Sequence, residues 1–167
     1  MIHRILAASS LVLAFAHGAA AQPAVFVVRH AERADAGMAA AKVAGADPDL
    51  SALGRDRADS LATVLKDAQI AAIFVTEYRR TQQTAAPLAR RAGITPTRLT
   101  SKDIPGLVEK IKGATGNVLV VGHSNSVPEL IKALGISAVP TIEEEDFDNL
   151  FVVVRGPKPM LLRLHYR

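Results

Sequence analysis

The chain has 167 residues, of which 49% are hydrophobic and 22% charged, the balance of a single folded globular domain. The 20 Lys and Arg residues against 16 Asp and Glu give a mild net charge of +4, and only 4% of residues are aromatic. Nucleic-acid-binding surfaces need clustered basic residues, often with aromatic stacking residues, so no nucleic acid is expected as a partner. The absence of cysteine excludes disulfides and thiolate chemistry.

Residues 1–21 have the pattern of a secretory signal peptide. A short basic start, MIHR, precedes the apolar run ILAASSLVLAFA, which is too short to span a bilayer, and Ala19-Ala20-Ala21 forms a small-residue cleavage site. We therefore expect a single domain over residues 22–167, periplasmic or secreted, with no stable membrane span after signal removal. An N-terminal core helix or an uncleaved anchor is the alternative.

Buried strands and amphipathic helices alternate along the rest of the chain. Apolar runs predict strands at 25–28, 71–75, 97–99, 118–121, 150–154 and 160–166. Apolar stripes with helical spacing predict helices that start at 52, cover 79–92 and 104–112, and lie around 127–134, and a loop is expected at 34–50. This order predicts a three-layer α/β/α sandwich with a mostly parallel sheet and the last two strands as an edge hairpin.

Basic residues follow three of the predicted strands, at the point where each strand ends. Arg29 and His30 follow the first strand. Arg79 and Arg80 follow the second, and His123 comes shortly after the fourth. In open α/β sheets ligands bind beyond the carboxyl ends of the strands, so these side chains should meet at one edge. A tetrahedral phosphate suits them, because guanidinium groups pair bidentately with its oxygens and helix N-termini favour anions.

Four segments, read in order, resemble the histidine phosphatase superfamily, which has the phosphoglycerate-mutase-like fold. They are VVRHAE, LSALGRDRA, TEYRRTQQTA and VVGHS, within a resemblance that spans residues 24 to about 155. Arg29-His30-Ala31-Glu32 stands where the family has Arg-His-Gly. TEYRRTQQTA aligns with Ser-x-x-x-Arg-Ala-x-Gln-Thr-Ala, which selects Arg80 rather than Arg79 as the pocket arginine. With the signal peptide, the resemblance implies a small exported branch of this superfamily.

The resemblance implies a phosphatase of the histidine acid type that needs no metal and no cofactor. In it a ring nitrogen of His30 attacks phosphorus to form a phosphohistidine, which water then hydrolyses. Arg29, Arg80 and a protonated His123 would bind the substrate's phosphate oxygens and oppose protonation of His30. A hydrogen bond to the other ring nitrogen must fix the tautomer of His30. The expected substrate is a phosphomonoester or similar group, on a small molecule or an envelope component.

A general acid for the leaving group has three candidates, each with a structural alternative. Glu32 could instead pair with Arg33 or Arg79. Asp103 could cap the helix that follows it, and Glu129 lies in the first turn of a helix, where a carboxylate is favoured anyway. We therefore expect a weak general acid or none, and a preference for substrates whose leaving group is already good.

Two other functions fit parts of the sequence. Residues 122–126, Gly-His-Ser-Asn-Ser, follow a strand and precede a helix like the nucleophile elbow Gly-x-Ser-x-Gly, and Asp148 and His165 could complete a triad with Ser124. This serine hydrolase leaves the basic residues at the other strand ends unexplained. A non-catalytic phosphate-binding envelope protein is the second alternative. The acidic run Glu143–Asp146 is expected to be a solvated loop, as such runs mostly are, and a metal site is the alternative, for which no matching histidine is found.

Overall fold

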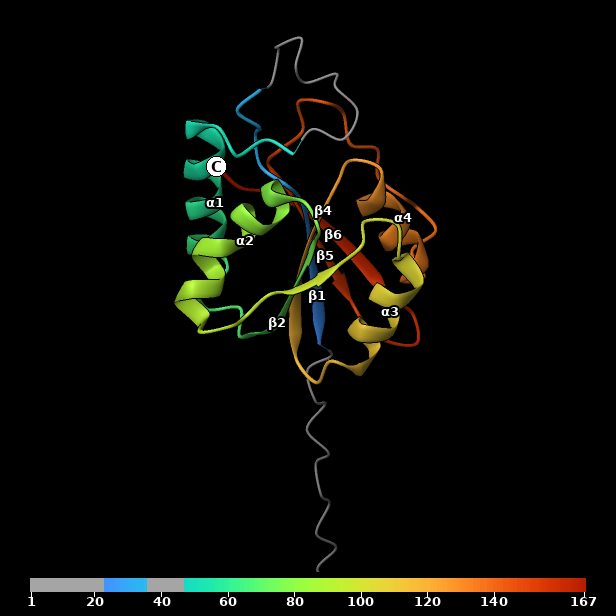
Figure 1. The fold of residues 1–167 in the computed structure, drawn as a ribbon. Helices are drawn as coiled ribbons and strands as arrows, with labels where there is room; N and C mark the ends of the chain where they lie inside the picture. Colours follow the sequence, from blue (N-terminus) through green and yellow to red (C-terminus); the bar gives the residue numbers. More distant parts are fainter. Residues whose placement is uncertain (1–22, 36–46) are drawn as a thin grey trace, which may run out of the picture.

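The computed structural model describes residues 23–35 and 47–167, so the signal peptide expected over residues 1–21 lies outside the described part. Six strands alternate with four helices in it, and together they build a sheet between two helical layers (Figure 1). The elements are β1 (Ala24–Arg29), α1 (Ala52–Val64), β2 (Ile70–Thr76), α2 (Arg79–Ala92), β3 (Thr97–Leu99), α3 (Ile104–Gly113), β4 (Asn117–Gly122), α4 (Ser126–Ala133), β5 (Asn149–Val154) and β6 (Met160–His165). The predicted α/β/α sandwich is confirmed.

The six strands are arranged in the order β3-β2-β4-β1-β5-β6. The first four of these run parallel, β5 is antiparallel to β1, and β6 is antiparallel to β5. The last two strands therefore form the expected hairpin at one edge. Since β2, β4 and β1 are neighbours and parallel, their carboxyl ends meet at the same edge of the sheet.

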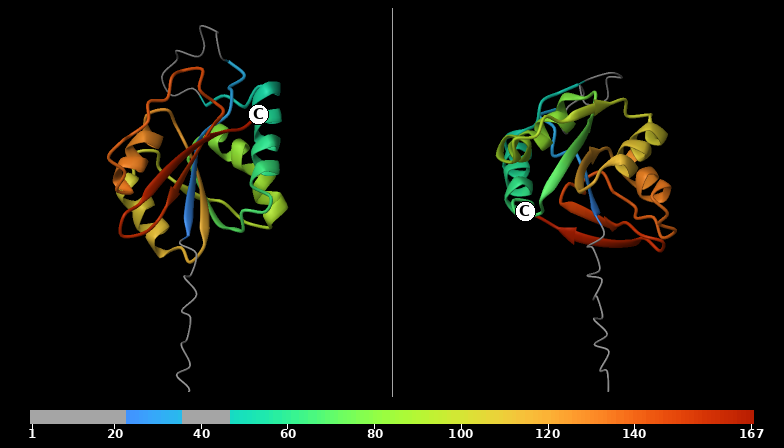
Figure 2. Two further views of the ribbon diagram at one scale, coloured as in Figure 1. Left: turned by 180° about the vertical axis from the view of Figure 1, so that it is seen from behind. Right: turned by 90° about the horizontal axis from the view of Figure 1, so that it is seen from below.

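Helices α1 and α2 cover one face of the sheet, and α3 and α4 cover the other (Figures 1 and 2). Alternate residues of β4 enter the two cores: Leu119 packs with Leu61 of α1, whereas Val120 belongs to the cluster of Ile111 and Leu130 from α3 and α4. Residues 118–121 of this strand are all apolar because both faces of the strand are buried. Among the described residues, no helix is long and apolar enough to cross a membrane.

Local signals set the helix boundaries where the sequence predicts them. The hydroxyl of Ser51 accepts a hydrogen bond from the backbone N–H of Gly54, which caps α1. Helix α2 ends at Gly93, whose φ of 67° is left-handed. Gly54 also lies against the backbone of Glu32, and a Cβ there would overlap the Glu32 carbonyl oxygen. The start of α1 is thus packed directly on the segment that follows β1.

Candidate active site

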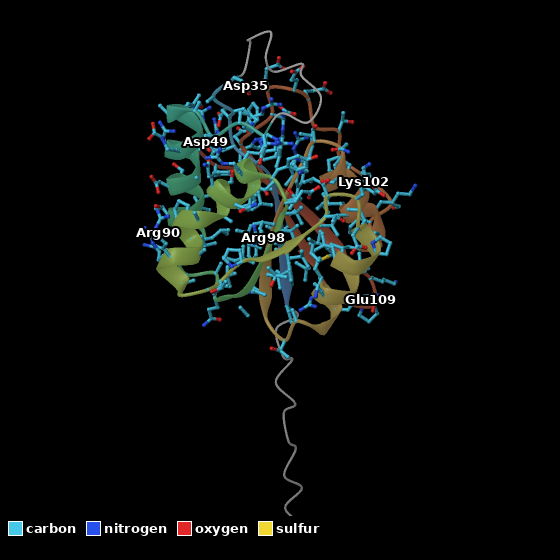
Figure 3. All side chains as sticks on the ribbon, in the orientation of Figure 1. Asp35, Asp49, Arg90, Arg98, Lys102 and Glu109 are labelled. Carbon is cyan, nitrogen blue, oxygen red and sulfur yellow. The ribbon has the colours of Figure 1, made fainter. Side chains whose placement is uncertain are left out.

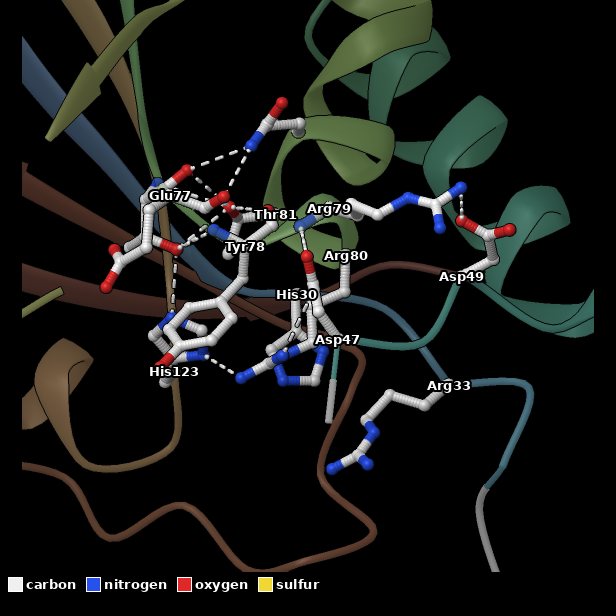
Figure 4. Close-up of polar contacts among 12 residues, drawn as sticks. His30, Arg33, Asp47, Asp49, Glu77, Tyr78, Arg79, Arg80, Thr81 and His123 are labelled. Atoms are coloured by element: carbon white, nitrogen blue, oxygen red, sulfur yellow. Dashed lines mark hydrogen bonds and ion pairs between the residues drawn. The ribbon is translucent and has the colours of Figure 1, made fainter. Parts of the chain in front are cut away.

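Four side chains predicted to form the site meet at the carboxyl ends of β1, β2 and β4, and Figure 4 shows three of them, His30, Arg80 and His123. Arg29 ends β1 and His30 follows it, His123 follows β4, and Arg80 lies in the first turn of α2. The rings of His30 and His123 are 5.4 Å apart between centroids and meet edge to face. His30 is only 4% exposed, and Arg29 and His123 are each 8% exposed. The structure therefore brings two histidines and Arg29, all buried, together with the half-buried Arg80.

Backbone contacts on both sides hold His30 in place. Its N–H donates to the Gly122 carbonyl at 2.9 Å, which extends the pairing of β1 with β4 by one residue. Its Nδ1 lies 2.8 Å from the Ala31 carbonyl oxygen. A carbonyl only accepts hydrogen bonds, so Nδ1 carries the proton and Nε2 keeps its lone pair. The Ala31 N–H in turn donates to Thr84 Oγ1 at 2.9 Å, which anchors this turn to α2.

Burial keeps both histidines neutral at pH 7. It lowers the pKa of His30 to about 3; His123, Arg80 and Arg29 act in the same direction, while the hydrogen bond to Ala31 opposes them. Burial, followed by the charge of Arg80, lowers the pKa of His123 to about 4. His123 is therefore neutral in the site without an anion, whereas the resemblance implies a protonated His123 in the complex with substrate. His30 has the unprotonated nitrogen that a nucleophile needs.

Each arginine stacks on an aromatic ring, and Arg29 also donates hydrogen bonds to two backbone carbonyls. The guanidinium carbon of Arg29 lies 4.1 Å from the centroid of the Phe147 ring. Its Nη1 donates to the carbonyls of Glu143 and Glu144 at 2.9 and 2.7 Å. The guanidinium carbon of Arg80 lies 4.2 Å from the centroid of the Tyr78 ring. Glu143, Glu144 and Glu145 of the acidic run are exposed, as expected for a solvated loop, and Asp146 is half-buried; the carbonyls of Glu143 and Glu144 position Arg29.

Three buried N–H groups of these arginines have no hydrogen-bond acceptor among the described residues. They are Nε of Arg29 and Nε and Nη1 of Arg80; Nη1 has an ion pair with Asp47 at 3.6 Å, beyond hydrogen-bond distance. A buried donor without a partner costs about 1–3 kcal/mol, so these groups favour an acceptor placed between them. The guanidinium groups stay charged despite burial, which lowers the pKa of each arginine from its ordinary value. An oxyanion supplies both the acceptor atoms and the negative charge.

Arg79, which the sequence could not exclude by position alone, lies outside this group. Its side chain is 59% exposed and pairs with Asp49 at 2.7 Å. Its backbone N–H, at the start of α2, donates to the carboxylate of Asp47 at 2.9 Å. Asp49 and the carboxyl end of β1 lie at the same end of the molecule (Figure 3). The arginine that faces the two histidines is Arg80.

Glu32 does not have the partner that the sequence suggested. It forms a bidentate ion pair with Arg57 of α1, with contacts of 2.6 to 2.9 Å. Arg33 pairs instead with Asp35 at 2.6 Å. The expected pairing of Glu32 with Arg33 or Arg79 is therefore wrong, because the backbone turns after β1 and carries Glu32 toward α1.

The other two candidate acids also have structural surroundings. Asp103 accepts a hydrogen bond from the Gly106 N–H at 2.9 Å and caps α3. Glu129 lies in the first turn of α4. Within the described part of the chain, neither these two carboxylates nor Glu32 has a hydrogen bond or ion pair with His30 or Arg80. Each of the three candidate carboxylates thus has a structural role, and the expectation of a weak general acid or none stays a prediction.

Sequence reasoning missed several residues that surround the site. Phe147 stacks on Arg29, and Asp47 lies 3.6 Å from Nη1 of Arg80. Thr76 Oγ1 lies 3.0 Å from Nε2 of His123. Thr76 belongs to the segment TEYRRTQQTA, so its place in that motif was a usable signal. Asp47 and Phe147 lie in loop segments without a pattern, and no local signal points to them.

The structure does not assemble a serine triad. His165 and Asp148 do pair, with Nδ1 and Oδ1 3.1 Å apart. Ser124, however, follows β4, while His165 lies on β6, three strand spacings away, about 14 Å at the usual separation of neighbouring strands. No group of three or more potential metal ligands occurs among the described residues either.

The sequence model of the histidine phosphatase superfamily (branch 1) matches residues 25–104, which contain Arg29, His30 and Arg80. Over these residues the chain is similar to the histidine phosphatase superfamily. No curated protein matches it in sequence.

Solved structures show the same fold as this chain. A mycobacterial glucosyl-3-phosphoglycerate phosphatase in complex with VO3 superposes with a TM-score of 0.66 at 17% identity, covering 86% of this chain and 98% of that chain. The protein histidine phosphatase SixA in complex with tungstate also gives 0.66, at 18% identity, covering 85% of this chain and 96% of that chain. At these identities the similarity concerns the fold alone.

Proposed function

We propose that this protein is a metal-independent phosphatase that works through a phosphohistidine on His30. The observation that carries the proposal is the set of buried guanidinium N–H groups of Arg29 and Arg80 without acceptors, beside a neutral histidine whose Nε2 lone pair is free. Similar proteins have been solved with VO3 and with tungstate, which are oxyanions like phosphate.

In this mechanism the phosphate group of the substrate lies among Arg29, Arg80 and His123. Nε2 of His30 attacks phosphorus, the bond from phosphorus to the leaving group breaks, and the leaving group takes the electron pair. The guanidinium groups stabilise the negative charge on the transferring oxygens. Water then attacks the phosphohistidine, which releases inorganic phosphate and restores the lone pair of Nε2.

The surroundings of the carboxylates favour a particular kind of substrate. Glu32 is tied to Arg57, and Asp103 caps α3. Without a strong proton donor, turnover depends on a leaving group that is stable once it departs. We propose that the substrate is a phosphomonoester or similar phosphorylated group of this type, on a small molecule or on an envelope component.

We also propose that residues 1–21 direct export, so that the enzyme acts in the periplasm or outside the cell. The support is the sequence pattern of a basic start, an apolar run and small residues before the cleavage point. Fractionation of cells that express the full chain, with N-terminal sequencing of the product, tests this. A protein that starts at residue 22 outside the cytoplasm is the expected result, and an unprocessed cytoplasmic protein would overturn it.

The test of function is phosphate release from an aryl phosphate by residues 22–167. Wild type is compared with His30→Ala, and with His165→Ala as a matched control, since His165 is exposed on β6 outside the site. We expect release by wild type and the control, inhibited by vanadate, and loss in His30→Ala. Release that persists in His30→Ala would remove His30 as the nucleophile. Phosphate binding without release by any of the three proteins would point to the non-catalytic binding protein.

A further inference from the structure

Two buried threonines, Thr76 and Thr81, form a hydrogen-bonded chain that starts at His123 and leads away from the site; Figure 4 labels His123 and Thr81. Nε2 of His123 lies 3.0 Å from Oγ1 of Thr76, the last residue of β2. Thr76 Oγ1 lies 3.0 Å from Oγ1 of Thr81, which is fully buried in α2. Thr81 Oγ1 lies 2.8 Å from the carbonyl oxygen of Tyr78.

The far end of this chain fixes the direction of every hydrogen bond in it. Two backbone carbonyls lie within reach of Thr81 Oγ1, that of Tyr78 at 2.8 Å and that of Thr76 at 3.3 Å, and because carbonyls only accept, the single hydroxyl proton of Thr81 is donated to them. Thr81 Oγ1 must then accept, both from the Thr76 N–H at 3.1 Å and from the Thr76 hydroxyl. Because the Thr76 proton is used in this way, Thr76 Oγ1 accepts from His123. The proton of the neutral His123 ring therefore lies on Nε2.

The near end leads independently to the same tautomer. Nη2 of Arg80 lies 3.4 Å from Nδ1 of His123. A guanidinium group only donates, so Nδ1 must be the acceptor and carries no proton. In the opposite tautomer, with the His123 proton on Nδ1, that N–H would face the N–H groups of Arg80, so two donors would meet. The Thr76 hydroxyl would then donate to Nε2 of His123, and no proton would remain for the contact between Thr76 and Thr81.

We propose that Thr76, supported by Thr81, is a positioning residue that holds the His123 ring with its proton on Nε2 and its Nδ1 toward Arg80. The ring and the guanidinium group are then fixed as one unit before the substrate arrives, which avoids reorganisation on binding. The role in phosphate binding rests on the proposed function, whereas the position of the proton can be measured without it.

The direct test is the ¹⁵N resonances of the histidine rings in residues 22–167 at pH 7. In wild type we expect His123 to show a protonated Nε2 and an unprotonated Nδ1, assigned by comparison with His123→Gln. In Thr76→Val, which keeps the shape but removes the hydroxyl, we expect a mixture of tautomers and vanadate binding about 5–10-fold weaker, the effect of one lost hydrogen bond. Thr76→Ser should restore both properties. Thr63→Val, on the exposed face of α1, is the control and should change neither.

Two outcomes would overturn the inference. A wild-type His123 with its proton on Nδ1 would do so without any variant, even if the substitutions destabilised the fold. An unchanged single tautomer in a folded Thr76→Val protein would show that the hydroxyl does not position the ring. The proposed function and this inference are tested independently. The His123 tautomer can be measured in His30→Ala, the variant in which phosphate release is expected to be lost.

Discussion

Glu32 and Arg57 form a bidentate ion pair that joins the segment after β1 to α1, with both side chains less than one-fifth exposed. The side chain of Arg57 also reaches the backbone carbonyl of Tyr166 at 3.3 Å, beyond the end of β6. A single guanidinium group therefore connects the turn beside His30, the first helix and the C-terminal hairpin.

Removal of Arg57 should destabilise the protein far more than an ordinary surface substitution. Arg57→Met leaves the Glu32 carboxylate partly buried without its partner, and we expect the free energy of unfolding to fall by about 3 kcal/mol. Urea denaturation measures it. The double variant Glu32→Gln, Arg57→Met should lose less than Arg57→Met alone, because no unpaired charge remains. Equal losses in the two proteins would show that the ion pair is not the cause.

Gly54 should not tolerate a side chain. In Gly54→Ala the new Cβ overlaps the backbone carbonyl of Glu32, and we expect a loss of about 3 kcal/mol, which outweighs the gain in helix propensity. Gly113, at the end of α3, has no heavy atom within 4 Å of an added Cβ and is the matched control. Thermal melts should show a lower Tm for Gly54→Ala and an unchanged or higher one for Gly113→Ala. A Tm for Gly54→Ala as high as that of wild type would mean that the start of α1 and the segment that contains Glu32 move apart at little cost in free energy.

Acid should weaken the fold through the two site histidines. The pKa of His30 falls from 6.5 to about 3 on folding, and that of His123 from 6.5 to about 4. From pH 6.5 down to about pH 3 for His30 and about pH 4 for His123, the unfolded chain binds protons that the folded chain does not. The free energy of unfolding therefore decreases as the pH falls below 6.5. Urea denaturation at pH 7 and pH 4.5 should show this loss, and His30→Gln should reduce it. The same loss in both proteins would place its origin elsewhere.

Phe147 should contribute to anion binding although it cannot contact phosphate by a hydrogen bond. Its ring supports the Arg29 guanidinium, and removing such a contact costs about 1 kcal/mol. We expect Phe147→Ala to weaken vanadate inhibition about fivefold, with Phe147→Leu in between because it restores packing but not the aromatic face. Inhibition constants that match wild type in both variants would show that the carbonyls of Glu143 and Glu144 are sufficient to hold Arg29.

The sequence predicts the elements well because their signals are local. Helix α2 is found from Arg79 to Ala92, as its apolar stripe and the following Gly93 indicate, and β4 extends the predicted strand by one residue at each end. The convergence of Arg29, His30, Arg80 and His123 also follows from sequence, because parallel neighbouring strands must end at the same edge.

Contacts between distant segments could not be predicted in this way. Glu32 pairs with a residue 25 positions away, on a helix face that the apolar pattern leaves undefined. The carbonyls that hold Arg29 come from 114 and 115 residues further along the chain, and no side-chain pattern marks a backbone acceptor. The neutral state of His123 depends on burial by the whole fold, which a sequence motif does not report.

The hydrogen bond from Nδ1 of His30 to the Ala31 carbonyl decides the chemical form of the proposed intermediate. Because that nitrogen is occupied, phosphorus can bond only to Nε2. The enzyme would thus form one of the two positional isomers of phosphohistidine, the tele isomer, and never the pros isomer. Reagents that discriminate between these isomers could therefore detect the loaded enzyme directly, before its natural substrate is identified.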